Sequence, residues 1–237
     1  MASSNVRDDQ LPRGAGGAAE VKPLPAATVL VVRDAPLEVL MLRRTETSSF
    51  VPGAWVFPGG MMEPIDRELS GGSFLSAMRI TAARELFEET GVWLGAPLED
   101  SEPKRRRLLA GSLGFRSIFN EAPVELDRLV WTARWITPVG IPKRFDTYFF
   151  LAKVSRDAVA TAEEQEAMEV LWIAPEDALA RNAAGELGMV FPTIKTLEAI
   201  SGFTSADALL ESRRGIEIPA IEPILVIENG QKKIVLP

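Results

Sequence analysis

One short acidic segment holds the side chains of this chain that are best suited to chemistry. Residues 84–92 read R-E-L-F-E-E-T-G-V, so Glu85, Glu88 and Glu89 follow directly on Arg84. In a helix, which turns about 100° per residue, the three glutamates share one face and leave an apolar face to be buried. Three acids so spaced also suit a solvated helix face. They repel one another unless a cation lies between them, and hard oxygen ligands favour Mg²⁺ or Mn²⁺.

The remaining composition limits the alternative chemistries. The 237 residues include no cysteine and no histidine, which excludes disulfides, thiolate nucleophiles, the usual zinc sites and Ser-His-Asp triads. Acid–base chemistry must then come from carboxylates, lysines, the single Tyr148 or metal-bound water. The net charge of −7 argues against a nucleic-acid partner, although a metal ion can still mediate contact with polyphosphates.

Secondary-structure signals around the acidic segment predict a mixed α/β domain. A helix over residues 74–90 ends at Gly91, the residue type preferred for a left-handed C-terminal cap. A short strand at residues 54–57 precedes a glycine turn at Gly59 and Gly60. Further strands are expected at residues 26–33, 37–43, 129–137, 147–154 and 169–173, and further helices at residues 104–120, 175–183 and 192–200. These elements predict a central mixed sheet covered by helices.

The two ends of the chain differ from its middle. Residues 1–25 are rich in Ala, Gly, Ser and Pro and predict a disordered leader, and residues 26–237 a single domain with a C-terminal extension from about residue 201. The extension is expected to end in a β-hairpin that turns at Asn229 and Gly230. No apolar run approaches the roughly 20 residues of a membrane span, and no secretory signal is evident, so we expect a cytoplasmic protein without a membrane partner. A homodimer remains open.

The acidic segment resembles the Nudix box, G-x5-E-x7-R-E-U-x-E-E-x-G-U, where U is aliphatic. Gly60 matches the first glycine and residues 84–92 match the second half of the pattern. The resemblance implies an α/β/α sandwich and a metal-dependent hydrolase in which water attacks a nucleoside diphosphate derivative. It also implies that Glu85, Glu88 and Glu89 are catalytic metal ligands and that Gly60 holds the loop of the box. Arg84 stands four residues before Glu88, so it can orient that glutamate or brace the preceding loop.

Two departures from the Nudix box affect its first half. Asp66 stands where the pattern has glutamate, and 17 residues, 67–83, stand where it has seven. We expect the ten additional residues to form an enlarged loop before the helix without moving the three carboxylates, which share one rigid element. The role of Asp66 is left open.

Other segments narrow the expected substrate. Residues 48–60, 134–138, 142–147 and 172–175 resemble acyl-coenzyme A diphosphatases of the peroxisomal type and their bacterial relatives. This resemblance implies cleavage of coenzyme A or acyl-coenzyme A to 3′,5′-ADP and a phosphopantetheine. Two alternatives stay open: a pyrophosphatase for ADP-ribose or NADH, and a Nudix-fold binding or regulatory module without catalysis.

Several residues outside the helix are candidates for binding substrate or activating water. Gly59 and Gly60 are expected beside the substrate, with basic side chains for its phosphates at Arg43, Arg44, Lys143 and Arg144. Family members often use an acidic residue on a loop before a late strand as general base, and here Glu166 is best placed. The basic run at residues 104–107 is expected to be a solvated helix face.

Overall fold

The computed structural model describes residues 21–48, 51–163, 167–228 and 231–236. Its strands are β1 (Leu24–Arg33), β2 (Glu38–Arg44), β3 (Trp55–Val56), β4 (Gly59–Met61), β5 (Val130–Ile136), β6 (Phe145–Lys153), β7 (Ala167–Ile173), β8 (Ala220–Ile221), β9 (Ile224–Glu228) and β10 (Gln231–Val235). Its helices are α1 (Pro64–Leu69), α2 (Phe74–Thr90), α3 (Ser101–Leu109), α4 (Phe115–Glu121), a 3₁₀ turn η2 (Leu126–Arg128), α5 (Pro175–Ala183), α6 (Phe191–Ile200) and α7 (Ala206–Arg213).

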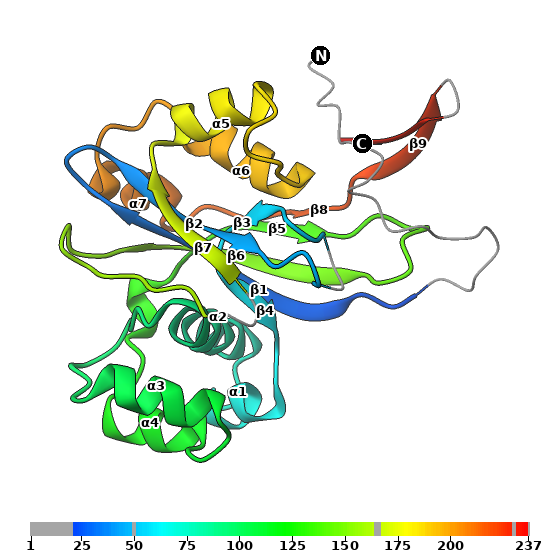
Figure 1. The fold of residues 1–237 in the computed structure, drawn as a ribbon. Helices are drawn as coiled ribbons and strands as arrows, with labels where there is room; N and C mark the ends of the chain where they lie inside the picture. The colour runs from blue at the N-terminus through cyan, green and yellow to red at the C-terminus, as the bar shows by residue number, and fades with distance from the viewer. Residues whose placement is uncertain (1–20, 49–50, 164–166, 229–230, 237) are drawn as a thin grey trace.

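A mixed sheet forms the centre of the molecule, as predicted. Its main strand order is β3-β2-β1-β6-β5-β8, with β4 added to β1 and β7 added to β2. Strands β1 and β6 run parallel, whereas β1 and β2 form the predicted antiparallel hairpin, in which Arg33 faces Glu38. Helices α1 to α4 cover one face and α5 to α7 the other (Figure 1). The fold is therefore the three-layer sandwich expected from the sequence.

Each face of the sheet has its own hydrophobic core. On one face, Val29, Val31 and Phe150 pack against Met78 and Leu86 of α2, and all five side chains are fully buried. On the other face, side chains of β1, β2 and β6 pack against helices α5, α6 and α7. Because alternate residues of a strand face opposite sides, strands covered on both faces read as nearly continuous apolar runs. The first of these two cores holds α2 against the sheet.

Helix α2 has the predicted bounds. Ser73 accepts a hydrogen bond at its N-terminus from the Ser76 amide, and Gly91 ends it in the left-handed conformation with φ of 75°. Part of the enlarged loop expected before this helix is helical instead, because residues 67–69 complete α1 and only residues 70–73 form the turn into α2. A similar correction applies to the single helix expected at residues 104–120. It is two helices, α3 and α4, separated by a turn in which Gly111 has a φ of 69°.

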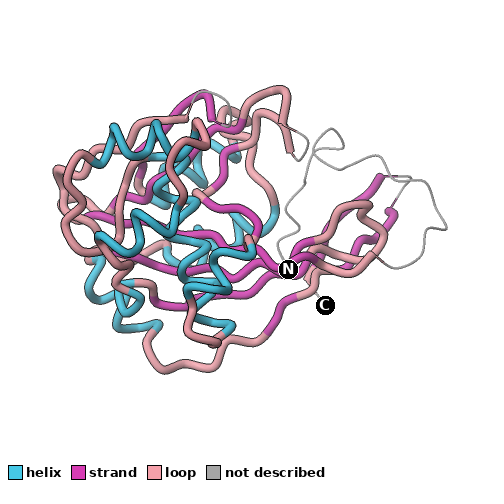
Figure 2. The backbone as a smooth tube through the Cα atoms, turned by 90° about the horizontal axis from the view of Figure 1, so that it is seen from below, coloured by secondary structure: helices cyan, strands magenta, loops and turns pink. Residues whose placement is uncertain are grey.

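The C-terminal hairpin is confirmed as a separate two-stranded sheet in which β10 pairs antiparallel with β9. Figure 2 shows it at one end of the molecule, away from most of the helices. Its expected turn at Asn229 and Gly230 lies outside the described residues, as do residues 1–20 of the expected leader. Leu24 and Pro25, which we expected to end that leader, instead begin β1. No helix in the described ranges is long and apolar enough to cross a membrane.

Candidate active site

Strand β4 brings two glycines against the acidic face of α2. Pairing with β1 sets Gly59 opposite Thr28 and Gly60 opposite Ala27. The Gly59 amide donates a hydrogen bond of 2.9 Å to Oε2 of Glu89. A Cβ on Gly60 would lie 2.5 Å from the Glu85 carboxyl group. The close approach of β4 to α2 therefore depends on glycine, which explains why the turn and the glutamates belong to one motif.

Arg84 and Asp66 form a buried ion pair behind the glutamates. Arg84 is 2% exposed and Asp66 is fully buried. The Arg84 guanidinium donates through Nε to Oδ1 and through Nη2 to Oδ2 of Asp66, each at 2.9 Å, and Nη2 also donates to the Met61 carbonyl oxygen. Oδ2 of Asp66 further accepts from the Thr81 hydroxyl and the Glu63 amide. This arrangement gives Asp66 the role left open by the sequence, which is to orient Arg84.

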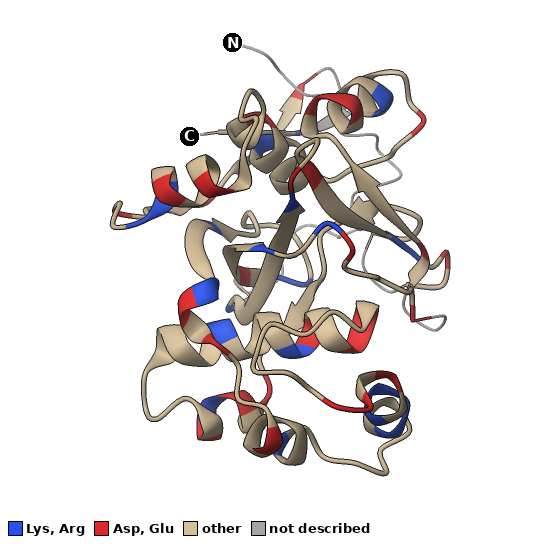
Figure 3. Cartoon of the chain, turned by 90° about the vertical axis from the view of Figure 1, so that its left-hand side faces the viewer, with Lys and Arg blue, Asp and Glu red and all other residues tan. Residues whose placement is uncertain are grey.

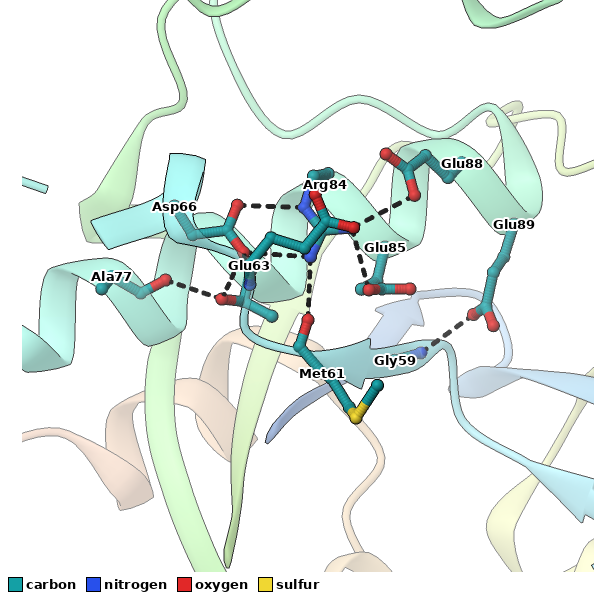
Figure 4. Close-up of polar contacts among 10 residues, drawn as sticks. Gly59, Met61, Glu63, Asp66, Ala77, Arg84, Glu85, Glu88 and Glu89 are labelled. Carbon is teal, nitrogen blue, oxygen red and sulfur yellow. Dashed lines mark hydrogen bonds and ion pairs between the residues drawn. The ribbon is translucent and has the colours of Figure 1, made fainter. Parts of the chain in front are cut away.

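The carboxylates of Glu63, Glu85 and Glu88 lie around the outer side of the same Arg84 guanidinium (Figure 4). Nη1 of Arg84 lies 2.9 Å from Glu85, 3.2 Å from Glu88 and 3.9 Å from Glu63. Sequence reasoning missed Glu63, since it falls between the conserved positions of the pattern. Although burial alone would lower the pKa of Arg84, the nearby carboxylates of Asp66, Glu85 and Glu88 raise it, so this side chain stays cationic.

The negative charge near Glu88 exceeds what Arg84 balances. Burial raises the pKa of Glu88 to about 7, Arg84 opposes that rise, and the charges of Glu63 and Asp66 add to it. A divalent cation near this group would offset both the burial and the repulsion. The carboxylates therefore fit a hard divalent ion by chemistry and by charge.

The glutamate side chains are not arranged as a finished coordination shell. Across the described ranges, no three acidic side chains are grouped closely enough to hold a metal ion. Glu85 and Glu88 turn toward Arg84, and Glu89 turns toward the Gly59 amide. Coordination by all three would need rotamer changes, which long glutamate side chains permit. Their assignment as metal ligands stays a prediction.

A pocket of about 610 Å³ opens beside the acidic cluster. Its lining includes Glu85 and Glu88, and among the predicted substrate-binding residues Arg44, Gly59 and Gly60, together with Lys143. Most of the remaining lining is apolar and comes from β1, the segment from β3 to α1, β5, the β5–β6 connection, β6, the start of α6 and the C-terminal segment. The pocket thus combines a carboxylate cluster, the three cationic side chains of Arg44, Arg84 and Lys143, and a long apolar wall, within the usual size range of ligand sites.

Two predicted phosphate-binding arginines have other partners. Arg43 forms an ion pair of 3.2 Å with Glu46. Arg144 is 3% exposed and donates to the carbonyl oxygens of Val21 and Thr137, each at 2.9 Å. It also pairs with Glu222. The structure thus gives Arg144 a role in holding chain segments together, and neither arginine lines the pocket; their predicted contact with substrate stays untested.

Comparison with known proteins agrees with the geometry of α2 and β4. The NUDIX domain model matches residues 22–193, about three quarters of the chain. The chain belongs to the Nudix family. A crystal structure of a NUDIX hydrolase from Alicyclobacillus acidocaldarius has 29% sequence identity and a TM-score of 0.74, and the match covers 81% of this chain and 97% of that one.

Curated relatives are Nudix hydrolases too. A Caenorhabditis elegans protein named as a nudix hydrolase is 32% identical over 74% of this chain, and the match spans 60% of its length. The acyl-coenzyme A diphosphatase NUDT19 of Gallus gallus is 29% identical over 81% of this chain and 72% of its own. The human NUDT19 is 24% identical over 80% of this chain and 68% of its own. The chain is accordingly a Nudix hydrolase, of a family that generally uses divalent metal ions.

The loop before β7 is attached to the C-terminal end of the Nudix helix α2. The amides of Thr161 and Glu163 donate to the carbonyl oxygens of Thr90 and Glu89, at 2.9 and 3.0 Å. Glu166, our candidate general base, lies outside the described residues, so its place relative to the glutamates is not described. The last amide of the loop that binds α2 in this way is that of Glu163, three residues before Glu166 in the sequence.

Arg105 joins this loop to α2, a role that the sequence did not predict. It is 3% exposed, and it donates through Nε to the Glu88 carbonyl oxygen and through Nη2 to the Thr161 carbonyl oxygen, each at 3.0 Å. A cation at the C-terminal carbonyls of a helix is favourable. Of the basic run, Arg106 and Arg107 are exposed as expected, whereas Arg105 is buried. Figure 3 shows that basic and acidic residues lie on helices in both of the layers that flank the sheet.

We expect Arg105→Met to destabilise the fold by about 2 kcal/mol, since charged hydrogen bonds to two carbonyl oxygens are lost. It should also lower kcat, because the end of α2 and the loop before β7 lose their common anchor. Arg106→Met is the matched control, because the Arg106 side chain is 71% exposed. Urea denaturation and steady-state kinetics would test both variants, and equal behaviour of the two would contradict this role.

Proposed function

We propose that this Nudix hydrolase cleaves the diphosphate linkage of coenzyme A or an acyl-coenzyme A. The observation that carries the proposal is the composition of the pocket, in which Glu85 and Glu88 share one cavity with a long apolar wall. A coenzyme A thioester has two parts that match this pocket. Its diphosphate needs a cation, which the carboxylates can hold, and its long arm carries little charge and suits the apolar wall. The names of the NUDT19 relatives support the same substrate class.

The proposed reaction adds water across the P–O–P linkage and releases 3′,5′-ADP and a phosphopantetheine. Mg²⁺ or Mn²⁺ held by Glu85, Glu88 and Glu89 would polarise the phosphoryl oxygens, lower the pKa of water and neutralise charge on the leaving phosphate. Arg84, fixed by Asp66, holds Glu85 and Glu88 on one side of the site. Arg44 and Lys143 in the pocket lining supply positive charge for the remaining phosphates.

A product screen of the purified protein tests this proposal directly. The protein would be incubated with Mg²⁺ or Mn²⁺ and with coenzyme A, acetyl-coenzyme A, ADP-ribose or NADH, and the products separated by chromatography. Release of 3′,5′-ADP is the expected result. Turnover of ADP-ribose or NADH alone would contradict the proposal and identify that compound as the substrate. Absence of turnover with every diphosphate and both metals would favour the binding or regulatory module.

A further inference from the structure

The C-terminal segment beyond the Nudix match contributes to the wall of the catalytic pocket. The family match ends at residue 193, yet Pro223 before β9 and Ile234 in β10 line the same cavity as Glu85 and Glu88. Helix α2 and the β9–β10 hairpin lie in separate parts of the molecule (Figure 1). The pocket therefore extends from the acidic cluster to a wall that two residues outside the family match help to form.

Three kinds of contact hold this wall in place. Strand β8 pairs with β5, with Ala220 opposite Arg134. The buried Arg144 pairs with Glu222, directly before Pro223. Farther along, Cδ2 of Leu225 lies 3.8 Å from where a Cβ of Gly140 would stand, so β9 rests on the β5–β6 connection. These contacts make the segment a fixed part of the pocket.

The neighbouring lining matches this wall in chemistry. The same lining contains apolar side chains from β5, the β5–β6 connection, β6 and α6, namely Ile136, Pro138, Ile141, Phe145 and Phe191. Contact with such side chains stabilises a bound apolar group by removing it from water, and this stabilisation does not depend on direction as a hydrogen bond does. A hydrocarbon chain suits this surface, whereas a second nucleoside or a sugar would leave hydroxyl groups unpaired.

We propose that this apolar wall binds the acyl chain of an acyl-coenzyme A, so that the C-terminal hairpin sets the preference for acylated over free coenzyme A. The inference rests on the proposed function. It assigns the residues after position 193 a direct part in substrate selection, with Ile234 and Pro223 as specificity-determining contacts.

Chain-length dependence provides the measurement. Burying one methylene is worth about a fourfold gain in kcat/KM, so acetyl-, butyryl- and octanoyl-coenzyme A should form a rising series until the wall is covered. Ile234→Ser should lower the ratio of kcat/KM for octanoyl- over acetyl-coenzyme A by about tenfold. Ile227→Ser is the matched control, since Ile227 lies in the same hairpin and is 73% exposed.

A second variant guards against misfolding of the hairpin. Ile141→Trp alters the wall from the β5–β6 connection, and it should lower the same ratio of kcat/KM for octanoyl- over acetyl-coenzyme A. A flat chain-length series, or the same ratio in Ile234→Ser and Ile227→Ser, would overturn the inference while leaving the proposed function intact. Failure of the wild type to cleave any coenzyme A derivative would instead remove the proposed function, and the inference with it.

Discussion

Replacing Glu88 with glutamine is expected to lower turnover by about 10³-fold or more while making the metal-free protein more stable. The loss follows because a ligand of a catalytic cation supports several kcal/mol of transition-state stabilisation, and each 1.4 kcal/mol is about tenfold in rate. Glutamine keeps the shape of the side chain and one oxygen, so the change removes charge and little else. Initial rates at saturating Mg²⁺ or Mn²⁺ would measure the effect.

The gain in stability follows from the pKa of Glu88. Its ordinary value is 4.5, and burial raises it to about 7 in the folded protein. Between these two pH values the folded state binds more protons than the unfolded state, so stability falls as pH rises. Above pH 7 the charged carboxylate therefore costs the metal-free fold about 1–3 kcal/mol. Glutamine removes that cost because it has no charge to desolvate.

The two measurements together separate catalysis from folding. Thermal denaturation in EDTA at pH 5 and pH 8 should show the stabilisation by Glu88→Gln at the higher pH only. Glu211→Gln is the control, because the Glu211 side chain is 81% exposed, and it should change neither rate nor stability. Full activity of Glu88→Gln would sink the assignment of this residue as a metal ligand.

The parts of the fold set by local rules could be read from the sequence. The bounds of α2 follow from apolar spacing and from Gly91, whose left-handed conformation ends the helix. The β1–β2 hairpin and the mixed sheet follow from apolar runs and turn residues. Helix α1 was missed because its six residues are too few to show an apolar period. The break near Gly111 was missed because apolar periodicity there is poor.

The candidate site divides in the same way. Glu85, Glu88 and Glu89 share one helix, so their phase could be calculated from spacing alone. The partners of these residues come from elsewhere in the fold, and no local rule reports them. Arg105 looked like a member of a solvated basic run, yet tertiary packing turns it inward onto the Glu88 carbonyl oxygen. From the sequence, Asp66 was only a departure from the glutamate of the motif. Its role in orienting Arg84 follows from the two hydrogen bonds between them, which the sequence does not report.

The second large effect is expected from Asp66→Ala, which should destabilise the protein by about 3–5 kcal/mol. The substitution leaves the Arg84 guanidinium 2% exposed without the carboxylate that binds both its Nε and its Nη2. A buried charge that loses its partner keeps its desolvation cost and loses its compensation. Urea denaturation would report the change in the free energy of unfolding.

The structure offers a control with the same pair geometry in a more exposed place. Arg134 binds Asp146 through two hydrogen bonds of 2.8 Å, but their side chains are 30% and 21% exposed. Asp146→Ala should therefore cost only about 1 kcal/mol. Equal losses in Asp66→Ala and Asp146→Ala would contradict the argument that burial makes the Arg84 pair important.

Loss of Asp66 should also weaken metal activation. Without Asp66, Arg84 is free to turn further toward Glu85 and Glu88 and to compete with the cation for their oxygens. Partners that orient metal ligands contribute about 10–100-fold to metal affinity or activity, so the Mg²⁺ concentration for half-maximal rate should rise by that order. Asp66→Glu restores the carboxylate with one more methylene in a filled space. It should recover metal activation at a cost of about 1–3 kcal/mol in stability, whereas a purely structural role would leave the Mg²⁺ requirement unchanged in both variants.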